Sequence, residues 1–184
     1  MRSRSMPGGR GTSWRSVVLG VAFALAAAVA AQPNAKAAAA QAARLAVLER
    51  FAGTWDVTAT TRLPKPAVAK SSFVWAWVLD HHFLRGESGI KSDGSQELQV
   101  FGHDAGGYSL WIFYSSGVSV TLPRGEWNES TATMAWKNAP TDPVLYTSRC
   151  SFEGAATMLC STQVKNLSGK LMIDVESVAV RRKP

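Results

Sequence analysis

Residues that carry chemistry are scarce in this chain. Its 184 residues include two cysteines, three histidines and 13 acids. It contains no Gly-x-Ser-x-Gly, no His-Glu-x-x-His and no glycine-rich phosphate-binding loop. Two cysteines without a histidine near them are not a zinc pattern either. The sequence therefore offers no catalytic residue and no metal site, and a protein without enzymatic activity is the favoured interpretation.

Long apolar runs are also lacking. The longest, Val17–Ala31, holds 15 residues and is interrupted by Gly20, whereas a helix that crosses a bilayer needs about 20. Arginines and no acids precede this run, and Ala28-Val29-Ala30 supplies the small residues that a signal peptidase reads. We expect residues 1–30 to be a cleaved signal peptide, and the mature protein to be periplasmic or secreted. Lys36 argues against an uncleaved membrane anchor.

The excess of positive charge is local. The formal charge is +7, and four of the 20 basic residues lie within the first 30 positions. The rest of the chain contains 16 basic and 13 acidic residues. Such a weakly basic and scattered distribution gives no indication of nucleic-acid binding, which concentrates Lys and Arg on one face.

The two cysteines fit an exported protein. Cys150 and Cys160 flank Gly154-Ala155-Ala156 symmetrically. If that tripeptide is a hairpin turn, residues whose numbers sum to 310 face each other, and the two cysteines do so. Directly opposed residues on paired strands lie within reach of a disulfide bond. We expect this bond in an oxidising compartment; two reduced, buried thiols are the alternative.

The first element of the mature chain is a short helix. Residues 31–44 form a linker and the start of this helix, and Ala37–Arg50 contains strong helix formers without Gly or Pro. Leu45 and Leu48 give the run one apolar face. Gly53 ends it.

After Gly53 the sequence becomes typical of β-structure. Turn signals recur roughly every 12 residues between runs rich in Val, Ile, Thr and aromatic residues. The interval between Pro66 and Asp93 must hold two strands with a bend near Asp80-His81. Residues 45–183 therefore predict an all-β domain, an antiparallel up-and-down β-barrel of about ten strands, because closing a meander removes its exposed edges.

Several of these runs are apolar on both faces. In residues 72–79 and 108–114, large apolar side chains occupy both odd and even positions. One face of each strand lines the barrel interior. The other face, if exposed, is a contact surface for a second copy of the chain.

Gly53-Thr54-Trp55, at the junction of helix and first strand, resembles the start of the lipocalin and calycin group. In that group the Trp closes the base of the barrel, and a basic residue of the last strand packs over it. The resemblance assigns these roles to Trp55 and to Arg181 or Arg182. Segments across residues 45–137 are also similar to an uncharacterised bacterial calycin-like family, distantly related to nitrobindin-type haem barrels.

The chain departs from that family at its histidines. Asp80-His81-His82 stands where Gly-Gly-Arg is usual, and His103 precedes Asp104 where Tyr is usual. His82 or His103 is a candidate axial ligand for haem, the cofactor that the resemblance suggests. Turn or surface histidines with polar partners are the alternative.

The abundance of tryptophan indicates a second type of site. Trp77 and Trp111 are candidate walls of a cavity for a small apolar ligand, although aromatic residues also favour strands without any ligand. The favoured hypothesis is an exported, non-catalytic binding module. The alternatives are a ligand-free envelope or assembly protein that forms a homodimer through its outer apolar faces, and a haem-binding barrel.

Overall fold

The computed structural model describes residues 35–104 and 106–183. The predicted signal peptide, residues 1–30, and the first residues of the predicted linker lie outside these ranges. The chain divides into two units, residues 1–42 and 43–184. A helix over residues 35–49 crosses that division; the sequence predicted it over 37–50. Within the described ranges, no helix has both the length and the apolarity to cross a membrane.

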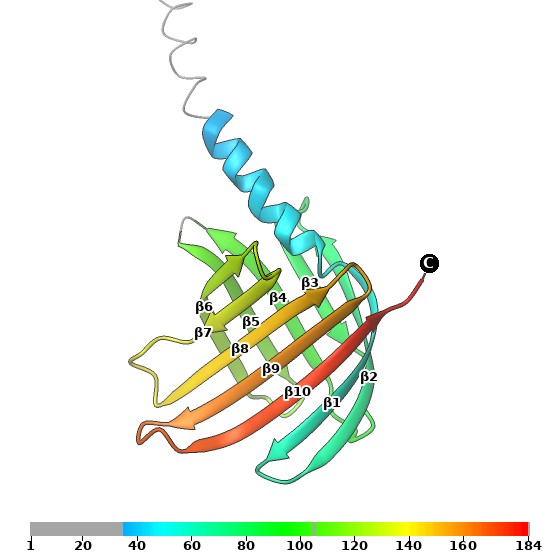
Figure 1. Ribbon diagram of the computed structural model, residues 1–184, viewed down its shortest axis with the longest axis vertical. Coiled ribbons are helices and arrows are strands. Elements are labelled where there is room, and N and C mark those ends of the chain that lie inside the picture. The colour runs from blue at the N-terminus through cyan, green and yellow to red at the C-terminus, as the bar shows by residue number, and fades with distance from the viewer. Residues whose placement is uncertain (1–34, 105, 184) are drawn as a thin grey trace, which may run out of the picture. The chain divides into compact units, whose positions relative to one another are not determined.

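Ten antiparallel strands form a closed barrel in which each strand pairs with its neighbours in sequence and β10 pairs with β1 (Figure 1). The predicted fold class is confirmed. The strands are β1 (Gly53–Leu63), β2 (Ala67–Val78), β3 (Phe83–Ser88), β4 (Glu97–Asp104), β5 (Gly107–Tyr114), β6 (Ser119–Asn128), β7 (Thr133–Lys137), β8 (Val144–Glu153), β9 (Thr157–Asn166) and β10 (Leu171–Arg181).

The predicted bend near Asp80-His81 is the turn between β2 and β3. Leu79, Asp80 and His81 all adopt left-handed backbone conformations, with φ of 51°, 52° and 63°. Three consecutive non-glycine residues in this region are unusual, because each Cβ crowds its neighbouring carbonyl. The turn has four residues and joins strands that pair in register from Phe73 to Val78.

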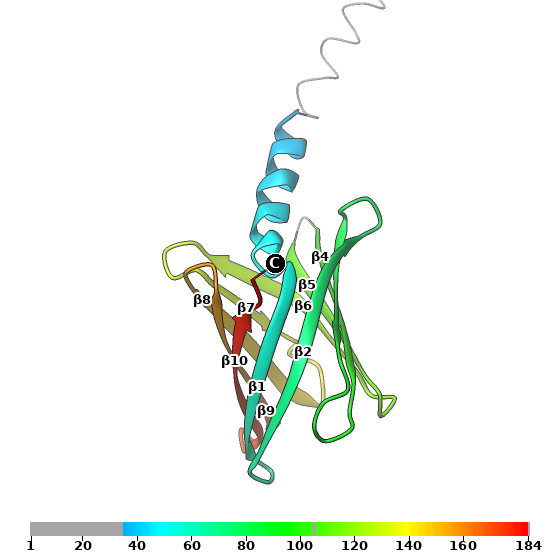
Figure 2. The ribbon, with the colours of Figure 1, turned by 90° about the vertical axis from the view of Figure 1, so that its right-hand side faces the viewer.

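The barrel has two different ends (Figure 2). At the helix end, residues 43–52 lead into β1. The end of β10 lies beside the start of β1, because Trp55 pairs with Arg181. The turn between β1 and β2 lies at the opposite, far end. We call the part of the interior near the helix end the helix half, and the part near the opposite end the far half.

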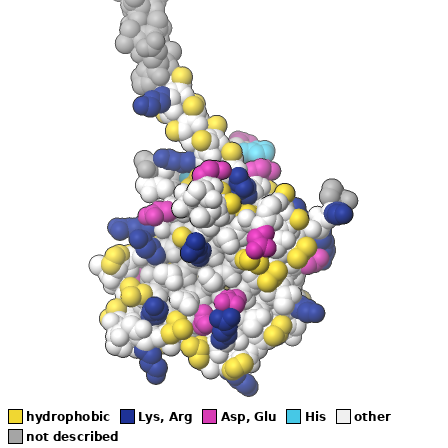
Figure 3. Space-filling model, in the orientation of Figure 1, with side chains coloured by type: hydrophobic (Ala, Val, Ile, Leu, Met, Phe, Trp, Pro, Cys, Tyr) yellow, Lys and Arg dark blue, Asp and Glu magenta, His cyan; other side chains and the backbone are white. Residues whose placement is uncertain are grey.

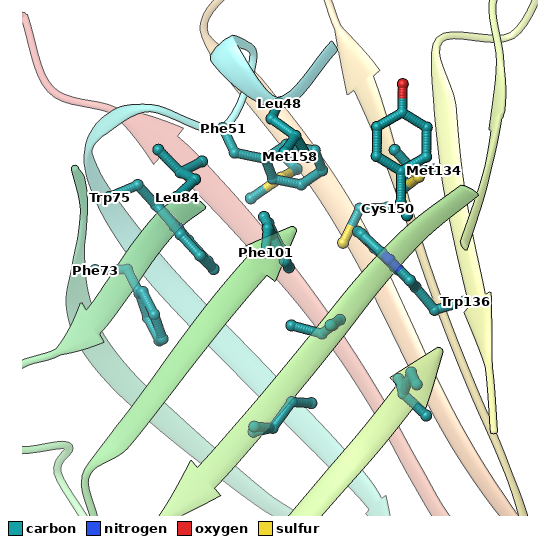
Figure 4. Packing of buried hydrophobic residues seen from close by; sticks show 14 of the residues in the cluster. Leu48, Phe51, Phe73, Trp75, Leu84, Phe101, Met134, Trp136, Cys150 and Met158 are labelled. Carbon is teal, nitrogen blue, oxygen red and sulfur yellow. The ribbon is translucent and has the colours of Figure 1, made fainter. Parts of the chain in front are cut away.

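The helix half is filled with aromatic side chains. Phe51 packs edge-on against Phe101 with 4.8 Å between ring centroids, and Phe101 stacks between Trp75 and Trp136 at 4.5 and 5.1 Å (Figure 4). Trp55 is fully buried and donates from Nε1 to the Phe51 carbonyl oxygen at 2.8 Å. Offset and edge-on ring pairs add to the free energy gained by burying these large side chains.

Trp55 closes the base of this half together with a basic residue from β10. The guanidinium of Arg181 lies 4.2 Å from the centroid of the Trp55 ring. Its N–H groups also donate to the carbonyl oxygens of Arg50, Ala52 and Ala155. Of the two residues that the sequence offered for this contact, Arg181 makes it.

The β8–β9 hairpin has the predicted register. All its paired residues, from Val144 with Asn166 to Glu153 with Thr157, have numbers that sum to 310. Cys150 and Cys160 are therefore opposite each other, and a disulfide bond joins them. Both lie on the inward face, next to the aromatic core.

Candidate functional site

Three of the four residues that the sequence singled out for ligand binding lie at the helix end. Trp77, at the end of β2, donates from Nε1 to the Glu49 carboxylate at 2.5 Å. Its ring centroid lies 5.6 Å from that of His81. Trp77 is therefore held by the last turn of the helix, and it is partly buried against the core.

His82 and His103 come close enough to interact electrostatically. Burial lowers the pKa of His103, and the positive charges of Arg44 and His82 lower it further, against the opposing effect of Asp104. His103 is consequently neutral at pH 7. Among the described residues its buried Nδ1 has no hydrogen-bond partner, and no group of three His, Cys, Asp or Glu side chains is arranged to hold a metal.

Trp111 lies on the other face of the sheet. Its neighbours Leu110 and Ile112 are buried in the core, and side chains alternate along a strand. Trp111 pairs with Val100 on β4 and Thr121 on β6 and is partly exposed. It is therefore part of the outer surface, and the four sequence candidates do not form one site.

The far half of the interior has a different composition. The inward-facing residues of β1, β2 and β10 are small there, and they are partly exposed although they face inward; they include Val57, Ala59, Thr61, Ala69, Ser71, Val175 and Ser177. In the helix half, the inward residues Trp55, Phe73, Trp75 and Ala179 of the same strands are buried. Water therefore reaches the inner surface of the far half.

Facing these small residues, β4 contributes a carboxylate. Glu97 pairs with Lys91 at 2.7 Å, with the two side chains only 11% and 19% exposed. Its carboxylate also accepts from the Gln99 amide, and its backbone N–H donates to Ser88 Oγ at 2.8 Å. A charged pair at this depth requires partners to offset its desolvation, and these residues supply them.

Two tyrosines place their hydroxyl groups beside this cluster. The Tyr114 and Tyr146 hydroxyl oxygens lie 3.4 Å apart, and Thr162 hydrogen-bonds to Tyr146. Asn138 fixes the Tyr146 backbone by accepting from its N–H at 2.9 Å and donating to the Val144 carbonyl oxygen at 2.7 Å. The hydroxyl pair is thus held on β5 and β8, which β6 and β7 separate in the barrel.

Burial raises the pKa of both tyrosines above the ordinary value of 10, and the nearby charge of Glu97 adds to the rise; at Tyr146 the hydrogen bonds with Tyr114 and Thr162 oppose it. At pH 7 both side chains are neutral hydroxyls. They can donate and accept hydrogen bonds, but they do not supply a phenolate base. The arrangement is suited to orienting a bound polar group.

The alternation of residues along β4 is a sequence signal for this cluster. Glu97, Gln99 and Phe101 alternate with Leu98 and Val100, so the polar residues share a face with a core aromatic residue. Charged residues on the core-facing side of a strand are uncommon unless they are paired. That parity would have placed Glu97 inside the barrel.

Neither a protein-family model nor a curated protein matches the sequence. Among solved structures, Rv2717c from M. tuberculosis is similar with a TM-score of 0.59 and 18% identity, over 76% of this chain and 98% of that one. An S-type phycobiliprotein lyase, CPES from Guillardia theta, has a TM-score of 0.48 and 15% identity, over 74% and 90% of the chains. A DUF3598 protein of unknown function from Nostoc punctiforme has a TM-score of 0.48 and 10% identity, over 73% and 48%.

These comparisons concern the fold alone, which here is a closed ten-stranded antiparallel barrel. At such low identity they assign no activity, because one barrel fold supports many functions. The similarity of residues 45–137 to an uncharacterised bacterial family, distantly related to nitrobindin-type haem barrels, is not tested by them and stays a prediction.

Proposed function

We propose that the protein is a non-catalytic binding module that holds a small ligand in the far half of the barrel. The ligand has an apolar body, which packs against small side chains such as Ala59 and Val57, and one polar group, which meets the hydroxyls of Tyr114 and Tyr146. The observation that carries the proposal is this hydroxyl pair beside inward-facing residues that water reaches.

The chemistry of the cluster supports binding over catalysis. Tyr114 and Tyr146 keep their protons at neutral pH, and the carboxylate of Glu97 is engaged by Lys91. An acid–base catalyst requires a group whose pKa lies near the working pH. The cluster instead offers fixed hydrogen-bond donors, which give orientation and specificity.

Native mass spectrometry of protein purified from its own host tests this function. We expect an added mass of a small molecule on the wild-type chain and its loss from Ser177→Leu, which fills the far half. Val178→Leu is the matched control, because Val178 is the next residue of β10 and points outward with 46% exposure. A wild-type protein without any bound molecule, or an adduct that persists in Ser177→Leu, would contradict the proposal.

We also propose that the mature protein is exported. The basic start, the 15-residue apolar run and the Ala28-Val29-Ala30 site in the sequence support this, and the Cys150–Cys160 disulfide is compatible with it. N-terminal sequencing of the protein from a cell-envelope fraction should begin near residue 31. A chain that starts at Met1 in the cytoplasm would contradict export.

Self-association is a second candidate, favoured by the outer face of β4 and β5. Phe113 is 45% exposed there and pairs with Leu98, while Trp111 pairs with Val100. A second copy would cover this face. Sedimentation analysis should then show a dimer that Phe113→Ser converts to a monomer; a wild-type monomer at high concentration would exclude it.

Haem binding through His82 or His103 is the third and least supported candidate. Both residues lie at the helix end, where Phe51 and Phe101 fill the interior. Haem would have to displace this packing. A Soret shift on haem titration that is lost in His103→Ala or His82→Ala would establish it, and an unchanged spectrum would remove it.

A further inference from the structure

The outer surface of the barrel carries a groove that the interior site does not use. It has a volume of about 340 Å³ and runs over four consecutive strands, β6 to β9. Trp136 and Cys150 face the core on β7 and β8, so Ala135, Lys137 and Arg149 face outward. The groove is therefore separate from the far half of the interior.

Strand register explains why this surface is hollow. Ala135 pairs with Arg149, and Arg149 pairs with Ser161. In the next row, Lys137 pairs with Thr147. Small side chains thus alternate with long ones, so the small ones form a floor and the long ones form walls. One extra residue in β6, between its pairs with Tyr108 and Leu110, adds the local twist that a bulge produces.

The walls of the groove are positively charged. Arg124, Lys137 and Arg149 line it with Glu126 as the one acid. Among the ion pairs within residues 35–104 and 106–183, none includes these three cations. Figure 3 shows basic side chains on the left of this face, over the strands of the groove.

Arginines elsewhere on the barrel surface behave differently. Arg62 contacts Asp174 and Glu176, and Arg182 pairs with Asp56 at 2.6 Å. Arg85 pairs with Glu87 on its own strand. The barrel therefore neutralises arginines elsewhere on its outer face, whereas the groove keeps three cations around a floor of Ala, Ser and Thr.

We propose that this groove binds a phosphate monoester group. Three cations and one carboxylate leave a charge of about +2, which complements the −1.5 to −2 of a phosphate monoester at pH 7. Arginine binds such oxyanions through two parallel N–H groups. The Ser161 hydroxyl, which also lines the groove, is a further donor. The phosphate belongs either to a small soluble metabolite or to a lipid headgroup.

Calorimetric titration of the mature protein with inorganic phosphate, and its co-sedimentation with vesicles of phosphatidic acid in phosphatidylcholine, test this proposal. We expect phosphate binding that weakens with added salt. The double variant Lys137→Gln/Arg149→Gln should bind about tenfold more weakly, because it removes both neighbouring walls. Retention on phosphatidic acid vesicles beyond that expected from the phosphate affinity would assign the site to a lipid headgroup; its absence would assign it to a soluble phosphate.

The matched control is Lys165→Gln, which removes one exposed cation from β9 outside the groove. It should leave the affinity unchanged. Arg124→Gln is a second groove variant, and its affinity should also fall, in case the double variant does not fold. Absence of binding by the wild-type protein in both arms, or an equal loss in Lys165→Gln and the groove variants, would overturn the proposal.

Discussion

The two halves of the barrel interior are built by the same strands in opposite ways. In the helix half, a Cβ added to Gly86 would meet the Trp75 ring at 2.4 Å, and one added to Gly125 would meet Trp136 at 2.5 Å. In the far half, Ala59 and Ser177 face inward and remain partly exposed. Large side chains fill the helix half and stabilise the barrel. The far half has small side chains and polar groups. A single barrel thus separates the part that holds it together from the part suited to a ligand.

The strongest test of this comparison is to remove the base of the helix half. Trp55→Ala should destabilise the protein by about 3–5 kcal/mol, because it creates a cavity beneath a fully packed aromatic layer. It also removes the ring beneath Arg181. Urea unfolding followed by fluorescence measures the change. Arg182→Ala, which removes an exposed ion pair with Asp56 just after β10, is the control and should leave the midpoint nearly unchanged.

The disulfide should contribute the next largest effect. Replacing Cys150 and Cys160 together by alanine removes a constraint on the unfolded chain, which costs about 2.5–3 kcal/mol for a loop of this length. Thermal unfolding of the double variant and of the oxidised wild-type protein gives the difference. If the two proteins unfold at the same temperature, the hairpin needs no covalent support.

One enlarging substitution in each half compares the packing of the two halves directly. Gly86→Ala should cost about 1–3 kcal/mol, since the new methyl group collides with the stacked Trp75 ring. Ala59→Val adds more volume to the far half and should cost less. Denaturant midpoints measure both. Equal penalties would mean that the far half is packed as tightly as the helix half.

The smallest predicted effect is on alkaline stability. The folded-state pKa of Tyr114 is raised by burial, so the unfolded chain ionises first. The resulting contribution to the free energy of unfolding is complete below pH 10 and is lost as the pH rises above 10. The loss is about 1.4 kcal/mol per pH unit for each such tyrosine. Urea titrations from pH 9 to 11 should show a shallower decline for Tyr114→Phe than for the wild-type protein. An identical decline would place this hydroxyl in water.

Local sequence signals were sufficient for the fold. Turn residues and alternating apolar runs predicted about ten strands, and the interval from Pro66 to Asp93 held two of them with the bend at Asp80-His81. The symmetric placement of Cys150 and Cys160 around Gly154-Ala155-Ala156 specified the register of a whole hairpin. These features depend on neighbours along the chain, and closure follows because it removes edge strands.

The candidate site depended on long-range information. Trp77 and Trp111 are both tryptophans on apolar strands, but strand parity places Trp111 outside, and the helix covers Trp77. Tyr114 and Tyr146 are 32 residues apart, and their hydroxyls meet because the sheet curves across the two strands between them. Residue type alone could not distinguish an inner face from an outer one when both were apolar.

Cysteine accessibility tests most directly whether the far half is open. Ala59→Cys and Ala179→Cys place a thiol on the inward face of β1 and of β10, the first in the far half and the second in the packed half, where Ala179 is 1% exposed. In native protein with its disulfide intact, a small neutral thiol reagent should modify Ala59→Cys readily and leave Ala179→Cys unmodified. Equal protection of both thiols would contradict an open, ligand-accessible far half.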